Sequence, residues 1–212
     1  MYKRQLLVPV VLLLLAACHS APKSLPILGQ PTLRETTRDG HAGTDTVYPA
    51  IPDFHLLDQD SNHISGASLH NNIYIADFIF LSCPSICPKL TREMKKVYDH
   101  YAGDDRVILI SHTIDAEHDS IPRLKAYADN LGVLTAHWHF LTGNEDSILD
   151  LAEHSYYTMA YPDSTAPGGF AHGGGLLLVD RNRHIRGVYD GTRSEETDRL
   201  IKDVQTLLQR SF

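Results

Sequence analysis

Cys83 and Cys87 are the residues whose types and spacing point most directly to chemistry. They lie four positions apart in the run Cys-Pro-Ser-Ile-Cys-Pro, which follows an apolar segment at residues 73–81. Where a strand leads into a helix, unpaired backbone N–H groups and partial positive charge lower the pKa of a thiol at the helix start. Two helical residues four apart share one face, so both sulfurs can point at one centre. We therefore expect a reactive pair, acting as a redox dithiol or as part of a metal site.

The three-residue spacer between the cysteines can close a disulfide, and it can also hold the sulfurs apart as a chelate. Two thiolates with one imidazole form a soft site of low coordination number, which favours copper, whereas structural zinc prefers a fourth ligand. His172 is our candidate for the imidazole. It lies in Gly-Gly-Phe-Ala-His-Gly-Gly-Gly, and glycines let the backbone approach a site closely. The alternative is a surface histidine in a flexible loop, since the chain has 13 histidines.

Two acidic residues accompany the candidate site. Asp77 interrupts the apolar segment that leads to the cysteines, and as a buried carboxylate with a raised pKa it would accept a proton from a thiol. Asp115 ends the next apolar segment and is a candidate for ordering the site loop. The alternative for each is a hydrogen-bonded structural acid.

Two further groups can be interpreted without a functional role. His137 and His139 alternate around Trp138, which would allow chelation on one side of a strand, but a solvated edge is the simpler interpretation. Packing is our explanation for an aromatic group ahead of His172, formed by Tyr156, Tyr157 and Tyr161.

The N-terminus has the pattern of an export signal. Lys3 and Arg4 precede an apolar run at residues 6–15, which is too short to span a membrane, and Leu-Ala-Ala-Cys18 is typical of a lipoprotein processing site. We expect residues 1–17 to be removed, Cys18 to be lipidated, and the protein to be anchored to a bacterial inner membrane with its domain facing the periplasm. In that oxidising compartment the remaining cysteine pair can be a structural disulfide, a redox disulfide or a metal site.

The rest of the chain is predicted to form a tether and one domain. Residues 18–50 are rich in Pro, Thr, Gly and Ser without periodicity, which indicates a tether with an irregular N-terminal extension, and residues 51–212 form the domain. The formal net charge is −7, and no basic patch is present to neutralise phosphates, which excludes a nucleic-acid partner.

The apolar patterns predict an α/β fold. We expect strands at residues 73–81, 106–114, 175–179 and 185–189, and helices at residues 84–100, 121–131, 144–154 and 194–209. Asp119 or Ser120 would cap the second helix, Gly132 would end it, and Ser194 would cap the last. Parallel strands with crossover helices, followed by a hairpin and a closing helix, give a thioredoxin-like fold with a central mixed sheet flanked by helices.

From residue 51 onward the chain resembles the Sco/SenC family of copper chaperones for cytochrome oxidase assembly. The resemblance rests on the order of several short motifs: Cys-Pro-x-x-Cys-Pro at 83–88, Ile-Asp at 114–115, Asp-Ser-Ile-Pro at 119–122, Trp-His-Phe-Leu-Thr-Gly at 138–143, His172, Leu-Val-Asp at 178–180, and Ile-Arg-Gly-Val-Tyr-Asp-Gly at 185–191. The chain departs from the family at Ser82, Gly173 and His112, which leaves the candidate ligands untouched but affects what surrounds them.

The resemblance implies a thioredoxin-like fold and copper ligands at Cys83, Cys87 and His172. It also implies delivery of copper, as Cu(I) or Cu(II), to the binuclear copper A centre of oxidase subunit II, or reduction of that centre's cysteines. The expected partners are therefore subunit II, or another copper or thiol protein, and the membrane through the lipid anchor.

Two classes of function remain open from the residues. A metallochaperone would bind copper and pass it on without being an enzyme. A periplasmic thiol-disulfide oxidoreductase would cycle Cys83 and Cys87 through thiolate exchange, and His172 would be dispensable. A peroxiredoxin-type peroxidase would need an Arg and a Thr near its attacking cysteine, a pattern that Leu81 and Ser82 do not offer.

Overall fold

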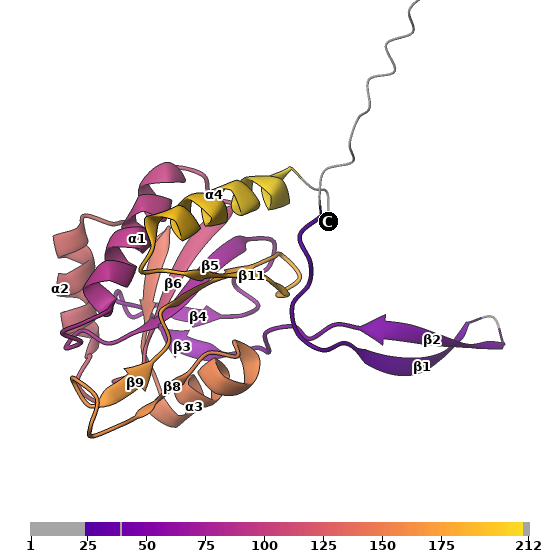
Figure 1. The fold of residues 1–212 in the computed structure, drawn as a ribbon, viewed down its shortest axis with the longest axis horizontal. Helices are drawn as coiled ribbons and strands as arrows, with labels where there is room; N and C mark the ends of the chain where they lie inside the picture. Colours follow the sequence, from indigo (N-terminus) through magenta and orange to yellow (C-terminus); the bar gives the residue numbers. More distant parts are fainter. Residues whose placement is uncertain (1–23, 39, 210–212) are drawn as a thin grey trace, which may run out of the picture.

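A five-stranded mixed sheet forms the centre of the protein (Figure 1). The computed structural model describes residues 24–38 and 40–209. The strand order is β11-β10-β5-β6-β7, with β5, β6 and β7 parallel and β10 and β11 antiparallel to their neighbours. The strands of this sheet are β5 (Ile73–Ile79), β6 (Val107–Thr113), β7 (Trp138–Leu141), β10 (Gly175–Val179) and β11 (Ile185–Asp190).

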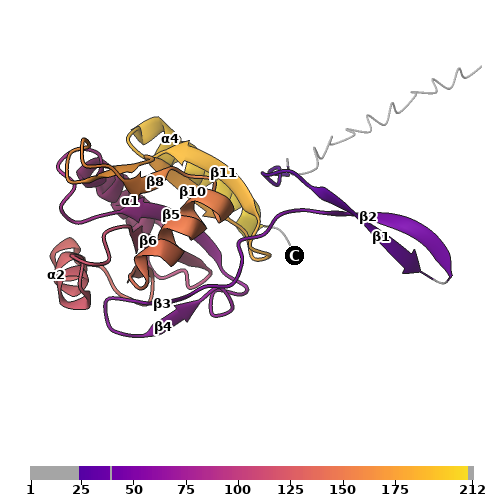
Figure 2. The ribbon, with the colours of Figure 1, turned by 90° about the horizontal axis from the view of Figure 1, so that it is seen from below.

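Helices cover both faces of this sheet, which confirms the expected α/β, thioredoxin-like arrangement (Figures 1 and 2). One face carries α1 (Cys87–His100), α2 (Ile121–Leu131) and α4 (Ser194–Leu208), and the other carries α3 (Glu145–Asp150), which continues as a π-helical turn at Leu151–Ser155. All seven residues of β5 and of β6 are buried, as expected for parallel strands covered on both sides.

The helix boundaries follow the sequence pattern with local differences. Helix α2 begins and ends as predicted, and Gly132 terminates it with φ +65°, the left-handed conformation that glycine adopts most readily. Ser120 flanks α2 without a side-chain capping bond. Ser194 is the first residue of α4 rather than its cap, and its hydroxyl accepts a hydrogen bond from Lys96 instead.

The segment expected to be an irregular extension contains a regular hairpin. Strands β1 (Thr32–Arg38) and β2 (His41–Val47) pair antiparallel over seven residues each and project from the body of the protein (Figures 1 and 2). Apolar alternation did not reveal them because almost every residue in the hairpin is exposed. Cys18 lies outside the described residues. Within them, no helix combines the length and the apolar character that a membrane span requires.

Two further ribbons were not predicted, because each of their strands is only three residues long. One joins β3 (His55–Leu57) to β4 (His63–Ser65), and the other joins β8 (Ala160–Pro162) to β9 (Phe170–His172). The β8–β9 ribbon carries His172, one of the candidate metal ligands.

A buried arginine attaches the segment before the hairpin to the edge of the sheet. Arg186 on β11 is 7% exposed, and it donates to Asp180 at 2.6 Å, to the Pro26 carbonyl at 2.9 Å and to the Leu25 carbonyl. The Leu28 amide donates to the Ile185 carbonyl at 2.8 Å. The described chain is therefore held against the domain from its beginning, before the hairpin projects.

His112 lies in an aromatic cage on the face opposite α1. Its ring stacks on Phe78 at 4.9 Å between centroids and meets the rings of Phe54 and Tyr156 at 5.6 and 5.7 Å. Neither ring nitrogen has a hydrogen-bond partner among the described residues. Burial lowers the pKa of His112 to about 3, so the imidazole is neutral in the folded protein.

We predict that His112 makes the protein sensitive to acid. Because its folded pKa lies below the unfolded value, the unfolded chain binds the extra proton, and stability is lost as pH falls from about 6.5 toward 3. For one such group the loss is roughly 3 kcal/mol at about pH 4. In denaturant unfolding between pH 7 and 4, His112→Leu should lose distinctly less stability than the parent. His63→Gln, at an exposed site, is the matched control, and equal pH dependence in parent and His112→Leu would contradict the prediction.

Candidate metal centre

The two cysteines lie at the junction of β5 and α1, but only one of them is helical. Cys87 is the first residue of α1, whereas Cys83 lies in the preceding turn, with its amide donating to the Phe80 carbonyl at 3.2 Å. The expectation that both share one helix face is therefore wrong. The turn from Pro84 to Ile86 brings the sulfurs together instead, because it folds the chain back before the helix begins.

His172 completes a compact group of three donor atoms. Its Nε2 lies 3.3 Å from the Cys87 sulfur and 3.7 Å from the Cys83 sulfur, and the three atoms all lie within 4.8 Å of one another. Metal–ligand bonds of about 2.3 Å to sulfur and about 2.0 Å to nitrogen, meeting at roughly 100–120°, place S and N about 3.3–3.7 Å apart. The donors are therefore spaced for a single metal ion. Among the described residues, no other group of three or more His, Cys, Asp and Glu side chains brings its donor atoms this close together.

The β8–β9 ribbon and a close backbone approach hold His172 in place. His172 ends β9 and pairs with Ala160, and the Gly173 amide donates to the Met159 carbonyl at 2.8 Å. The His172 ring meets the edge of Phe80 at 5.4 Å. Gly168 precedes β9 with φ +87°, and a Cβ there would lie 2.6 Å from the Phe80 ring, so only glycine allows this approach.

The second nitrogen of His172 has no hydrogen-bond partner among the described residues. When Nε2 binds a metal ion, a neutral ring would carry its proton on Nδ1, whereas in the metal-free protein the proton lies on Nε2, which faces the sulfurs. Metal-binding histidines usually donate this second N–H to an acceptor, which fixes the ring and increases its basicity. His172 is instead oriented by aromatic packing against Phe80 and by the ribbon backbone.

The two thiols differ in acidity because their surroundings differ. Partial burial raises the pKa of Cys83, but hydrogen bonds from His172 and from the Cys87 and Ser85 amides outweigh burial and lower it to about 6. Burial raises the pKa of Cys87 well above the usual thiol range, and a neighbouring thiolate at Cys83 raises it further. In the metal-free reduced protein, Cys83 is therefore the nucleophilic thiolate and Cys87 the protonated thiol.

Asp77 is buried as expected. It lies on the α1 face of β5, paired in register with Ser111, and burial raises its pKa to about 7 while the Ser111 hydroxyl opposes that rise. Its negative charge contributes to the raised pKa of Cys87. Acceptance of a thiol proton by Asp77 stays a prediction.

Asp119, not Asp115, contacts the loop that carries Cys83. Asp115 pairs with His118 at 2.6 Å. One carboxylate oxygen of Asp119 accepts from the Leu81 amide at 2.9 Å and from the Thr113 hydroxyl at 2.7 Å. Sequence reasoning considered Asp119 only as a helix cap. Its position just before a helix and its Ser-Ile-Pro context gave no signal for a contact 38 residues back along the chain.

The remaining candidates lie apart from the three donor atoms. His139 pairs with Asp58 at 3.1 Å and His137 with Asp105 at 3.8 Å, so the two histidines have separate partners. Tyr156 is buried, as packing would require. The packing explanation fails for the other two tyrosines, because Tyr157 is 60% exposed and Tyr161 is 48% exposed.

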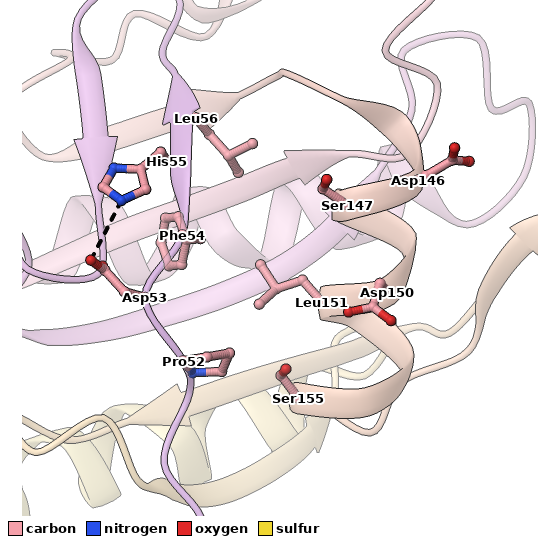
Figure 3. A pocket seen from close by; sticks show the side chains of 10 residues that line it. All are labelled: Pro52, Asp53, Phe54, His55, Leu56, Asp146, Ser147, Asp150, Leu151 and Ser155. Atoms are coloured by element: carbon pink, nitrogen blue, oxygen red, sulfur yellow. Dashed lines mark ion pairs between the residues drawn. The ribbon is translucent and has the colours of Figure 1, made fainter.

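A separate groove of about 510 Å³ lies between the segment before β3 and the helical segment 145–155 (Figure 3). Asp53 and His55 form a surface pair at 3.6 Å on one side, and Asp146 and Asp150 lie on the other. Cys83, Cys87 and His172 are not among the residues that line it.

We predict that Cys83 is alkylated far faster than Cys87 in the reduced, metal-free protein, with a midpoint for the rate near pH 6. His172→Ala should move this midpoint upward, because it removes a hydrogen bond that stabilises the thiolate. Iodoacetamide labelling followed by peptide mass spectrometry separates the two sites, and His118→Ala provides an exposed-histidine control. A Cys83 midpoint near pH 9, or one indifferent to His172→Ala, would refute the assignment.

We predict that Asp119→Ala costs about 1–3 kcal/mol of stability, because it leaves the Leu81 amide and the Thr113 hydroxyl without their acceptor. Loosening of the loop should also lower the affinity of the three-donor site for a metal ion. Asp119→Asn keeps an acceptor oxygen and should recover most of both losses. Guanidinium unfolding and Cu(I) competition titrations measure the two effects, and unchanged metal affinity in Asp119→Ala would show that the loop does not depend on Asp119.

Comparisons with known proteins agree with this fold. The SCO1/SenC family model matches residues 43–209. The solved structure of BsSco, described as a member of the Sco family of cytochrome c oxidase assembly proteins with a disulfide switch, is 27% identical, with a TM-score of 0.68 over 77% of this chain and 95% of its own.

Two structures with lower identity share the fold. A SCO1/SenC family lipoprotein from Bacillus anthracis is 23% identical, with a TM-score of 0.70 over 76% of this chain and 95% of its own. Bradyrhizobium japonicum ScoI, solved with copper bound, is 24% identical, with a TM-score of 0.60 over 73% of this chain and 98% of its own. The family match covers most of the chain, including the two cysteines and His172, and the protein therefore belongs to the SCO1/SenC family.

Proposed function

We propose that the protein carries one copper ion on Cys83, Cys87 and His172 and delivers it to the binuclear copper A centre of cytochrome oxidase subunit II. The observation that carries this proposal is the convergence of two thiols and one imidazole at distances suited to one metal ion. The solved relative with bound copper and the relative named for oxidase assembly support it.

The donor set is suited to Cu(I). Two thiolates and one imidazole are soft ligands in a three-coordinate arrangement, and no fourth His, Cys, Asp or Glu joins the group among the described residues. Copper binding must remove a proton from Cys87, whose pKa is raised by burial. Loading is therefore accompanied by proton release and strengthens as pH rises.

The position of the site suits transfer. Cys83 is 7% and Cys87 4% exposed, whereas His172 is only partly buried and lies on a short ribbon with glycines on both sides. An acceptor thiolate can thus approach from the His172 side and replace ligands one at a time, so that copper is never released to water.

We further propose that the protein is exported and anchored through lipid on Cys18 to the inner membrane, with its domain in the periplasm. The sequence around Cys18 and the related lipoprotein from Bacillus anthracis support this location. If Cys18 is the anchor, only residues 19–23 separate it from the described chain, which the Arg186 contacts hold against β11 from Leu25 onward. Such a short connection, at most about 3.5 Å per residue, would keep the domain close to the membrane.

Thiol-disulfide exchange is the second candidate function. The difference in acidity between Cys83 and Cys87 favours it, because a reactive thiolate beside a protonated thiol is the arrangement of a dithiol reductant. The Cys83 thiolate would attack a partner disulfide and form a mixed disulfide, and Cys87 would then displace the partner. Cys83 and Cys87 would be oxidised to a disulfide, while the partner would gain two electrons and two protons as two thiols.

We predict that the reduced full-length protein binds one Cu(I) tightly under anaerobic conditions. His172→Ala should weaken binding by at least about tenfold and Cys83→Ala by more, because they remove one of three ligands. His63→Ala, far from the three donors in the sequence and exposed, is the matched histidine control. Competition with a chromogenic Cu(I) chelator measures the affinities. Copper binding indifferent to His172, together with intact disulfide reductase activity, would replace the chaperone proposal by the oxidoreductase.

A further inference from the structure

The β8–β9 ribbon has two faces with different neighbours. Directly paired residues of an antiparallel ribbon project to the same side, so Ala160 and His172 share one face while Tyr161 and Ala171 share the other. His172 reaches the two sulfurs, which makes its face the inner one. The opposite face is turned outward on the same strand that carries the candidate ligand.

Three large apolar side chains are exposed around this outward face. Tyr157, Met159 and Tyr161, which we call the ribbon surface, are 60%, 52% and 48% exposed. They line one groove of about 420 Å³ together with Glu153. Tyr157 also lines a neighbouring apolar groove that includes Val188, which is 50% exposed. Large apolar side chains that are exposed side by side often mark interaction sites, and tyrosine and methionine are enriched in such sites.

The backbone at Tyr157 gives an independent indication. Its φ is +53°, in the left-handed region that residues with a Cβ adopt rarely. A tyrosine there is held in a disfavoured conformation with most of its side chain in water. Packing against a second molecule would supply the contacts that this side chain lacks in the free protein.

The charge of the groove indicates the kind of partner that it would bind. Glu153 is exposed in the ribbon-surface groove, and no Lys or Arg is among the described residues that line this groove. An apolar groove with one uncompensated carboxylate is complementary to a segment in which a basic side chain lies between apolar ones.

We propose that the ribbon surface docks the copper-accepting protein through such a basic and apolar segment. The apolar groups cover Tyr157, Met159 and Tyr161, and the cation pairs with Glu153. This inference rests on the proposed function and adds to it the surface and the chemistry of the partner. Docking here holds the acceptor against the ribbon, so that its thiolates reach past the ribbon edge to the partly buried His172 and the metal on the inner face. A small interface allows the partners to separate after transfer.

Copper transfer with two kinds of acceptor tests the proposal. The full-length protein, loaded with Cu(I) in detergent, is mixed with the apo copper A domain of oxidase subunit II or with the small chelator bathocuproine disulfonate, which needs no docking surface. Two variants remove the proposed contacts: the triple variant Tyr157→Asn, Met159→Gln, Tyr161→Ser, and the charge reversal Glu153→Lys. Leu134→Gln, at a side chain that is 64% exposed elsewhere, is the matched control.

We expect both variants to deliver copper to the protein acceptor at least about tenfold more slowly than the parent. Copper stoichiometry, the rate of removal by the chelator and the behaviour of Leu134→Gln should stay unchanged. Equal delivery by the parent and the triple variant would overturn this inference alone. Slower removal by the chelator would also overturn it, because the three residues would then belong to the metal site. A parent that binds no copper would instead refute the proposed function, and this inference with it.

Discussion

The pairing of β5 with β6 on one side and β10 on the other is the constraint on which the site depends. All seven residues of β5 are buried, and its neighbours hold it in register from Ile73 to Ile79. A strand buried on both faces cannot slip without moving apolar groups to the wrong side and leaving backbone groups unpaired. The turn that carries Cys83 therefore follows a strand whose position is fixed. Just after that strand, the Asp119 carboxylate accepts a hydrogen bond from the Leu81 amide and holds the start of the turn.

The three donor atoms are brought together by a long buried helix and a short ribbon. Cys87 begins a helix whose inner residues Leu90, Met94 and Val97 are fully buried, so its sulfur is firmly placed. His172 ends a three-residue strand that belongs to a separate ribbon, and its Nδ1 has no hydrogen-bond partner in the part of the chain that the structure describes. This difference in support suits the proposed transfer of copper, in which one ligand would leave before the others.

The electrostatics of the site follow from where the chain buries charge. Cys87 begins α1 and Asp77 lies on the sheet beneath it. Burial raises the pKa of both groups, and the charge of Asp77 raises that of Cys87 further, so both hold their protons. Cys83 lies outside the helix and receives hydrogen bonds from His172 and from backbone amides, so it is the thiol that ionises first. The same asymmetry therefore underlies both proposed functions, copper loading and thiol exchange.

The sequence predicted the elements with strong periodicity and singled out the candidate donor residues. The apolar runs of β5 and β6 and the amphipathic pattern and terminal glycine of α2 predicted those elements to within a few residues, since burial on one or both faces leaves a direct trace in the chain. Cys83 and Cys87 stood out by their spacing after a long apolar run, whereas His172 is one of 13 histidines and was singled out by its glycine-rich loop and by the resemblance to the Sco/SenC family.

How those residues meet depends on tertiary contacts. The placement of Cys83 before the helix, the contact from Asp119 to Leu81 and the two faces of the β8–β9 ribbon depend on contacts between residues far apart in sequence or on strands of three residues. The β1–β2 hairpin likewise has no apolar pattern, because its backbone pairing stabilises it without burying a face. Periodicity records burial, whereas backbone hydrogen bonds and close glycine contacts leave no periodic trace, and these decide where the ligands lie.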